Sequence, residues 1–343
     1  MAVVNTRSKP KPRRGVYELY WRFASRRQDA FERRLRGETA PWSDDPILQT
    51  FKFCNVFRAA DRVSQYMIRS VCYADDAGSP EDRVFQIVAF RTFSKIGTWD
   101  RLTALLDGPP RIRHLTDGRF VAALDQIKRE TGGLYTGAFI LCANKAFGHD
   151  QKHRNHAALF EKMFVQDAVA ARLIGANAFE SLVRTLEGYP LMGPFMAYQT
   201  AIDINYSDLT DFSENDYTQA GPGAMRGLAK VFEDLGDFTP SEAIQWMVDQ
   251  QQSEFERLEL PFSGLFGRPL HAIDCQGLFC ETDKYCREAA PELASNRSRI
   301  KARYRPSTMS LALFFPPKWR LTPPVRTIPA ASIQAQPDLF ACA

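Results

Sequence analysis

Apolar residues recur along much of this chain with the 3.6-residue period of an α-helix. The clearest case is residues 16–36, where apolar side chains at helical spacing are separated by arginine and glutamate, and Gly37 follows as a typical helix end. Asp45-Pro46 is a typical helix start for a second helical pattern over residues 47–71. The same reasoning predicts helices at 83–94, 98–107, 156–171, 177–187, 194–204, 224–235, 240–256 and about 274–290.

Residues 108–155 break this pattern. Pro109-Pro110, Gly132-Gly133 and Gly137 interrupt short apolar runs such as 138–142, which predicts a small β-hairpin or an irregular insert. The fold class expected is therefore mainly α, with a minor β or irregular element in the middle of the chain.

The two ends of the chain differ from the region between them. Residues 1–14 carry five basic residues and no acid, and residues 306–343 are rich in proline, so we expect a disordered basic tail and a flexible tail. Residues 15–305 are then the helical catalytic region, with two lobes, the insert at about 108–155 and a hairpin within 186–204.

Charge adds a hint of nucleic-acid binding. The 343 residues carry a net charge of only +4, which alone proves no such partner. Basic residues occupy every second position from Arg297 to Arg305, however, and such a run could follow a phosphate backbone, with Arg303 as a DNA-binding candidate. A solvated face is the alternative interpretation.

The seven cysteines match no metal-binding spacing, and no apolar run is long enough to cross a bilayer. We therefore expect no metal, no cofactor and no membrane association. A cytoplasmic monomer with reduced thiols is the simplest expectation.

The segment Leu186–Gln199 reads as a helix, a tight hairpin at Tyr189–Gly193 and a second helix that begins at Pro194. Gly193 stands where a turn needs a residue without a Cβ atom, or where the backbone approaches another molecule closely. The unpaired N–H groups of the first turn after Pro194 favour an anion such as a DNA phosphate. An ordinary αα-hairpin remains the alternative.

Tyr189-Pro-Leu-Met-Gly193 resembles the hairpin of the helix-hairpin-helix DNA glycosylase superfamily, and Gly193-Pro-Phe-Met-Ala197 resembles its 3-methyladenine branch. The resemblance implies that Tyr189, Leu191, Met192, Gly193 and Phe195 contact DNA. Leu191 replaces the first glycine of the usual hairpin. Phe195 occupies the position of the Schiff-base lysine of bifunctional members, which implies a monofunctional enzyme.

A second resemblance covers most of residues 16–290. Pro41-Trp-Ser-Asp-Asp-Pro46, Phe53-Cys-Asn-Val-Phe-Arg58, Arg91-Thr-Phe-Ser-Lys-Ile-Gly97 and Ala220-Gly-Pro-Gly-Ala224 resemble the family named for the helical domain of 5-hydroxymethyl-deoxyuridine DNA kinase, whose relatives are linked to phage thymine hypermodification. Asp274 and Glu281 belong to a further segment that is similar to this family. The sequence contains no Gly-x-x-x-x-Gly-Lys-Ser/Thr loop for a nucleotide triphosphate.

Asp216 follows the hairpin at the distance at which the glycosylase branch places its catalytic carboxylate, so the resemblance implies that Asp216 stabilises positive charge on the sugar of a flipped nucleotide. Asp208 and Asp211 are rivals for this role. The expected substrate pocket consists of Tyr217, Asn55, Arg58, Arg62, Gly221 and Gly223. Asn55, Arg58, Asp61 and Arg62 fall at helical spacings, and they could instead form a buried polar network. Gly221 and Gly223 could instead simply begin a helix.

Three functions are compatible with these features. The first is a monofunctional DNA glycosylase that excises a modified base, as in defence against phage. The second is a hypermodification enzyme that acts on 5-hydroxymethylpyrimidines in DNA, and the third is a non-catalytic DNA-binding module. Gln336-Pro-Asp-Leu-Phe340 also resembles the peptide by which bacterial DNA enzymes dock on the sliding clamp.

Overall fold

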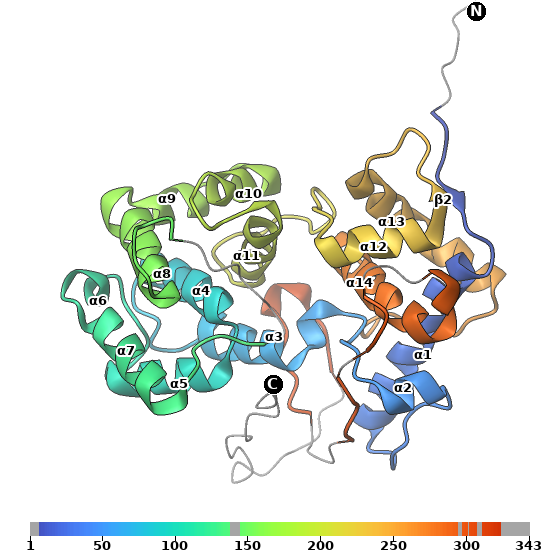
Figure 1. The fold of residues 1–343 in the computed structure, drawn as a ribbon, viewed down its shortest axis with the longest axis horizontal. Coiled ribbons are helices and arrows are strands. Elements are labelled where there is room, and N and C mark those ends of the chain that lie inside the picture. Colours follow the sequence, from blue (N-terminus) through green and yellow to red (C-terminus); the bar gives the residue numbers. More distant parts are fainter. Residues whose placement is uncertain (1–6, 138–144, 294–296, 301, 307–310, 324–343) are drawn as a thin grey trace, which may run out of the picture. The chain divides into compact units, whose positions relative to one another are not determined.

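The computed structural model describes residues 7–137, 145–293, 297–300, 302–306 and 311–323. The chain forms two compact units, each described here by itself (Figure 1). Unit 1 comprises residues 1–61, 214–313 and 321–326, and unit 2 comprises residues 62–213, 314–320 and 327–343.

Unit 1 is built around three long helices. Its elements are β1 (Lys11–Pro12), α1 (Val16–Arg36), α2 (Pro46–Thr50), the 3-10 helix η1 (Arg58–Ala60), α12 (Pro222–Val231), β2 (Phe232–Asp234), α13 (Pro240–Arg257), α14 (Ala272–Ala289) and the 3-10 helix η4 (Pro291–Leu293).

Aromatic side chains join α1 to the other long helices. Tyr20 and Trp21 are fully buried, and their rings lie 4.8 Å from Phe279 of α14 and 5.1 Å from Phe255 of α13. Gly37 ends α1 in the left-handed conformation, with φ of 80°. The helix therefore lies where the apolar pattern over residues 16–36 predicts it.

Two glycines let α12 pack closely against α14 (Figure 1). A Cβ atom on Gly227 would lie 2.1 Å from the carbonyl oxygen of Phe279, and one on Gly223 would lie 2.6 Å from Sγ of Cys280. Gly221 is the N-cap of α12 and Pro222 its first residue. The segment Ala220–Ala224 is thus a helix start whose glycines serve helix packing.

An ion cluster strengthens the same helix pair. The carboxylate of Asp283, which is buried, lies 3.1 Å from Arg226, 3.0 Å from Lys230 and 2.9 Å from Arg287. Burial alone would raise the pKa of Asp283, but the hydrogen bonds from Arg287 and Lys230 lower it overall. The pairing explains how Lys230 can lie buried on α12.

The N-terminal segment differs from the expected disordered tail within its described residues. β1 pairs antiparallel with β2, with Lys11 opposite Asp234, and Arg7 forms a 2.8 Å ion pair with Glu242. The charges that suggested a solvated tail thus find acidic partners in unit 1.

The regular elements in the described part of unit 2 are all helices. Its elements are α3 (Arg62–Met67), the π-helix η2 (Ile68–Cys72), α4 (Pro80–Phe93), α5 (Ile96–Leu105), α6 (Arg113–Thr116), α7 (Arg119–Thr131), α8 (Lys152–Phe160), the π-helix η3 (Glu161–Gln166), α9 (Val169–Ile174), α10 (Phe179–Glu187), α11 (Pro194–Tyr206) and the 3-10 helix η5 (Pro317–Trp319).

Helix α4 is the centre of unit 2. All residues from Val84 to Phe93 are buried, and α4 contacts α5, α8, α9 and α11. Arg91 of α4 forms a buried ion pair with Asp203 of α11. A helix that is apolar on every side must lie inside a bundle, which is the position of α4.

Residues 108–155 differ from the predicted β or irregular insert. They contain α6, α7 and the start of α8, and their described part contains no strand. Phe120, Ala123, Leu124 and Ile127 form the buried face of α7. Their spacing is helical, but the flanking prolines and glycines obscured this short pattern in the sequence. Residues 138–142 lie outside the described part of the chain.

The described residues near the C-terminus differ from the expected flexible tail. The backbone N–H of Phe314 donates to Gln65, and the ring of Trp319 lies 5.4 Å from that of Tyr206. Lys318 donates to the carbonyl oxygen of Thr210 at 2.5 Å. Aromatic anchors within the proline-rich sequence therefore hold residues 314–320 on unit 2.

The prediction of a mainly helical chain is confirmed, with β1 and β2 as a small antiparallel pair. None of the helices in the described ranges combines the length and apolarity needed to span a bilayer.

The packing of α12 against α14 generates a stability prediction. Gly227→Ala should destabilise the protein by about 1–3 kcal/mol, because the new methyl group would collide with the backbone of α14. The matched control is Gly277→Ala on α14, where a Cβ atom would meet no atom within 4 Å. That change should stabilise the helix by about 0.5–1 kcal/mol. Urea unfolding followed by circular dichroism measures both, and equal midpoints would refute the close packing.

Candidate functional site

The predicted hairpin is a four-residue turn between α10 and α11. The N–H of Met192 donates to the carbonyl oxygen of Tyr189 at 3.1 Å, and Leu191 adopts the left-handed conformation with φ of 66°. A non-glycine residue rarely takes this conformation. The strained position of the turn is thus Leu191, where the glycosylase hairpin has its first glycine.

The conformation of this turn does not depend on a glycine at position 193. Gly193 has φ of −62°, which any residue can adopt, and a Cβ atom there would meet no atom within 4 Å. The N–H of Met192 is engaged inside the turn and its side chain is buried. The turn needs no glycine at 193 because Leu191 makes the reversal.

The remaining hairpin residues have mixed exposure. Tyr189 is buried and its hydroxyl accepts a 2.8 Å hydrogen bond from Arg172, whereas Phe195 on α11 is half-buried. All of these residues belong to unit 2, while Asp216 and Tyr217 belong to unit 1. Asp216 is exposed, and the Tyr217 hydroxyl donates to Gln219 at 3.4 Å. Contact of these residues with DNA stays a prediction.

The loop before η1 contains the best-defined polar cluster of unit 1. The backbone N–H of Asn55 donates to the carboxylate of Asp61 at 2.8 Å, and its side-chain amide donates to the carbonyl oxygen of Ala60 at 2.7 Å. Arg27 of α1 donates to the side-chain oxygen of Asn55 at 2.5 Å. Asn55 is therefore the centre of a network that fixes residues 55–61 on α1.

Asp61 is a half-buried acid with an unusual pKa. Burial raises the pKa of Asp61 to about 6, although the hydrogen bond from Asn55 and the charge of Arg27 lower it. A carboxyl group that titrates near neutral pH can exchange a proton with a substrate. Asp61 is the group in this cluster best suited to general-base chemistry.

A second buried acid, Asp274, holds the other end of the loop. Its carboxylate accepts the backbone N–H of Arg58 at 3.0 Å and that of His271 at 3.1 Å, so it both anchors η1 and caps α14. Burial raises the pKa of Asp274 to about 7, and the charge of Glu214 adds to the rise. Asn55, Arg58 and Asp61 thus belong to one hydrogen-bonded network, and their role in lining a substrate pocket stays a prediction.

Three further residues near the start of α14 extend the network, and none of them was predicted from the sequence: Glu214, Asn215 and Arg268. Glu214, which is buried, pairs with Arg268 at 2.9 Å, and the side chain of Asn215 accepts the N–H of Ala272 at 2.9 Å. Asn215, the residue before Asp216, therefore accepts a hydrogen bond from the first turn of α14. The acidic segment Glu214–Asp216 was the available signal, but the spacing did not tell which acid is buried.

Glu281, about two helical turns further along α14, binds the start of the loop. Its carboxylate accepts the N–H of Cys54 at 3.0 Å and pairs with Lys284, whose ammonium group lies 4.4 Å from the centre of the Phe53 ring. Residues 53–61 are thus held along α14 at Glu281 and at Asp274.

The remaining residues predicted for the site lie outside this network. Arg62 is exposed at the start of α3 in unit 2. Gly221 and Gly223 serve the start and packing of α12. Arg303 is exposed in unit 1, with its guanidinium 4.8 Å from the centre of the Phe51 ring.

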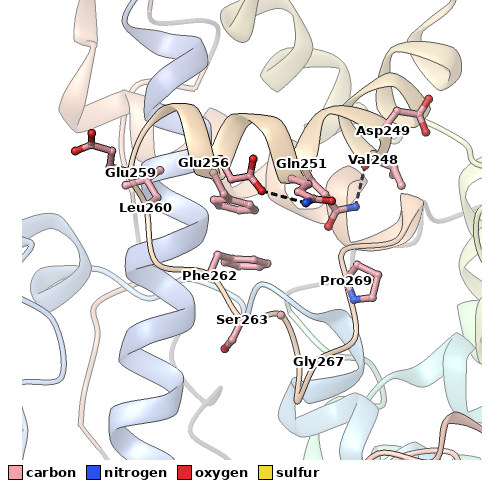
Figure 2. A pocket seen from close by; sticks show the side chains of 13 residues that line it. Val248, Asp249, Gln251, Glu256, Glu259, Leu260, Phe262, Ser263, Gly267 and Pro269 are labelled. Carbon is pink, nitrogen blue, oxygen red and sulfur yellow. Dashed lines mark hydrogen bonds between the residues drawn. The ribbon is translucent and has the colours of Figure 1, made fainter.

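A cavity of about 560 Å³ lies in unit 1 beside the C-terminal half of α13 (Figure 2). Its lining includes the carboxylates of Asp249, Glu256 and Glu259, and it contains no lysine, arginine or histidine. The rings of Phe255 and Phe262 stack 4.1 Å apart in its wall. Because it lacks cationic groups, this cavity is unsuited to a DNA phosphate.

No group of three or more histidine, cysteine or acidic side chains in the described ranges is placed to hold a metal ion. The clamp-like peptide Gln336–Phe340 lies outside the described residues.

Comparison with known proteins finds matches to the sequence of this chain but none among solved structures. The family described as "5-hmdU DNA kinase, helical domain" matches residues 14–295. A "5-hmdU DNA kinase" of Bacillus phage SP10 is 26% identical over 309 residues, which cover 84% of this chain and 48% of the relative. The chain thus spans about half the length of that relative. No solved structure matches.

These findings correct the expected activity. The relative is named as a DNA kinase, a phosphotransferase, so the prediction of a hydrolytic DNA N-glycosylase is wrong. The hairpin motif covers only a short stretch of the chain, and a resemblance to the wider helix-hairpin-helix superfamily is not shown. The longer set of motifs was the better guide, and by its match over residues 14–295 the chain belongs to the family of the 5-hmdU DNA kinase helical domain.

Proposed function

We propose that this chain takes part in DNA base hypermodification and acts on a 5-hydroxymethylpyrimidine in DNA. The observation that carries the proposal is the family match over residues 14–295, which contains the whole Asn55–Asp61–Asp274 network. The relative's printed name specifies 5-hmdU in DNA as the substrate of that protein.

The chemistry requires an accessible hydroxyl group. A 5-hydroxymethyl group on a stacked base is reached more readily when the nucleotide is flipped out of the duplex. Asp61 would accept the hydroxyl proton, and the resulting oxygen nucleophile would attack the phosphorus of a nucleoside triphosphate. An O–P bond forms to the γ-phosphorus, the bond from that phosphorus to the leaving nucleoside diphosphate breaks, and the proton remains on Asp61.

For this chain, we assign residues only to the steps at the modified nucleotide, and none to the binding of the triphosphate. Its sequence contains no P-loop, and it spans 48% of the relative. The assigned part is the binding of the modified nucleotide and the removal of its hydroxyl proton. The catalytic role of Asp216, the pocket role of Tyr217 and the DNA contacts of the hairpin residues stay predictions, as does a helix-hairpin-helix architecture.

A direct assay distinguishes the possible activities. The protein is incubated with ATP and duplex DNA that contains 5-hydroxymethyluracil, and the nucleosides are analysed by mass spectrometry. A nucleoside heavier by one phosphate group supports the proposal, whereas free base and alkali-labile sites would contradict it. Unchanged DNA that is nevertheless bound selectively would favour the non-catalytic module.

Asp61→Asn should lower the modification rate by about 10²- to 10⁴-fold, the typical contribution of a general base. The asparagine oxygen can still accept the N–H of Asn55, so the loop should stay folded. Asp44→Asn, which removes an exposed carboxylate of the same unit, is the matched control and should retain the rate. Equal rates for the two variants would remove Asp61 from the mechanism.

The raised pKa of Asp61 also predicts a pH profile. A general base works in its deprotonated form, so kcat/KM should rise as the pH increases through about 6. The rise should be absent from the residual activity of Asp61→Asn and present in Asp44→Asn. Initial rates between pH 5 and pH 8 provide the test, and a profile that Asp61→Asn leaves unchanged would contradict it.

A further inference from the structure

An antiparallel pairing in unit 1 brings a basic segment onto the loop that leads to Asn55. The N–H of Lys52 donates to the carbonyl oxygen of Ala302 at 2.9 Å, and the N–H of Tyr304 donates to that of Thr50 at 3.0 Å. Phe51 and Arg303 are directly opposite each other in this pairing. Arg303 thus lies opposite Phe51, which is three residues before Cys54 at the start of the candidate site.

Arg303 is oriented for binding an anion. Its guanidinium lies 4.8 Å from the centre of the Phe51 ring, which supports one face of the group and leaves the N–H edge for an acceptor. Arg305 is two residues further along, and an extended backbone would place it on the same side, about 6.6 Å from Arg303. Both residues are exposed, and neither has a carboxylate partner among the described residues.

Two arginines of helix α1 act electrostatically on Tyr304, which lies between Arg303 and Arg305 in the sequence. Arg27 and Arg34 are seven residues apart and so lie on one face of α1. Burial raises the pKa of the Tyr304 hydroxyl, and the charges of Arg27 and Arg34 counteract the rise, which places both close to Tyr304. Arg27 donates to the neutral amide of Asn55 and Arg34 lies 5.4 Å from the Trp42 ring. The charge of Arg27 also acts on Asp61, whose pKa it lowers.

Other arginines of α1 are paired differently. Arg26 pairs with Asp45 at 3.0 Å, Arg33 with Glu38 at 2.8 Å and Arg36 with Glu38 at 2.8 Å. Positive charge on α1 is thus compensated by carboxylates at those positions. The segment 302–305 is where exposed cations adjoin the loop of the candidate site.

We infer that Arg303 and Arg305 form a phosphodiester-binding surface that holds the DNA backbone beside the Asn55–Asp61 loop. This inference rests on the proposed function, because it takes DNA as the partner. A phosphate of a free nucleotide has the same chemistry as a backbone phosphate, and the test separates the two. A DNA backbone fits better because the cations are arranged in an extended row and not around a closed pocket.

The test is fluorescence anisotropy of the full chain with a labelled duplex that contains thymine and, separately, 5-hydroxymethyluracil. Arg303→Gln and Arg305→Gln should each weaken binding to both duplexes by about 3- to 10-fold. The double variant should lower the slope of log K against log salt concentration by about 2, since each phosphate contact contributes about 0.9. Arg36→Gln, which also removes one charge, should leave the slope unchanged.

Competing ATP identifies the source of the phosphate. ATP and sodium chloride are added separately to the protein–duplex complex at the same ionic strength. ATP should displace no more of the duplex than sodium chloride does. Displacement by ATP that the Arg303→Gln change abolishes would assign the surface to a nucleotide and overturn the inference. So would variants that bind the duplex like Arg36→Gln.

The outcomes separate this inference from the proposed function. Strong effects of the two variants without preference for, or modification of, 5-hydroxymethyluracil would retain the surface and refute the function. If 5-hydroxymethyluracil is modified and the variants bind the duplex normally, the proposed function is retained and the phosphodiester-binding surface is refuted. A wild-type chain that binds neither duplex would refute both.

Discussion

The first turn of α14 is the constraint on which the candidate site depends. Backbone N–H groups at a helix start have no partner within the helix, and a buried carboxylate must find hydrogen-bond donors. Asp274 meets both needs, because it accepts the N–H of His271 in the capping position and the N–H of Arg58 from a segment far away in sequence. Asn215 adds a third contact through the N–H of Ala272. The segments around residues 58 and 215 are thereby fixed to one helix end, and the geometry of Asp61 follows from that arrangement.

The burial of acids in this region is costly, and the surrounding charges show how the cost is managed. Glu214 pairs directly with Arg268. Burial raises the pKa of Asp274 to about 7 and the negative charge of Glu214 adds to the rise, although the charge of Arg268 and the backbone hydrogen bonds from Arg58 and His271 lower it. Asp283, further along α14, is surrounded by Arg226, Lys230 and Arg287 and its pKa falls. One helix thus carries two buried acids with opposite shifts. Asp283 stays charged and structural, while the segment near Asp274 contains the acids able to change protonation near neutral pH.

Much of the fold could be predicted from the sequence, because long helices carry a repeated apolar signal. The pattern over residues 16–36 gives α1 with its end at Gly37, and Pro46, Pro194 and Pro240 mark helix starts that the structure retains. Helix α7 escaped because glycines and prolines flank a pattern only four apolar residues long. The pairing of Phe51 with Arg303 could not be predicted, since it joins segments some 250 residues apart and follows from tertiary packing.

The site was harder to predict than the fold for a related reason. Sequence spacing brought Asn55, Arg58 and Asp61 together correctly because they are local, but it could not pair them with Arg27 or Asp274. The hairpin seemed stronger because it is contiguous, yet the positive φ of Leu191 and the ordinary φ of Gly193 show that a similar short sequence can make its turn differently. A motif of five residues fixes a local bend, whereas a reaction requires groups assembled from several segments. Motifs distributed over most of the chain constrain that assembly, and so they were the more reliable guide to the family.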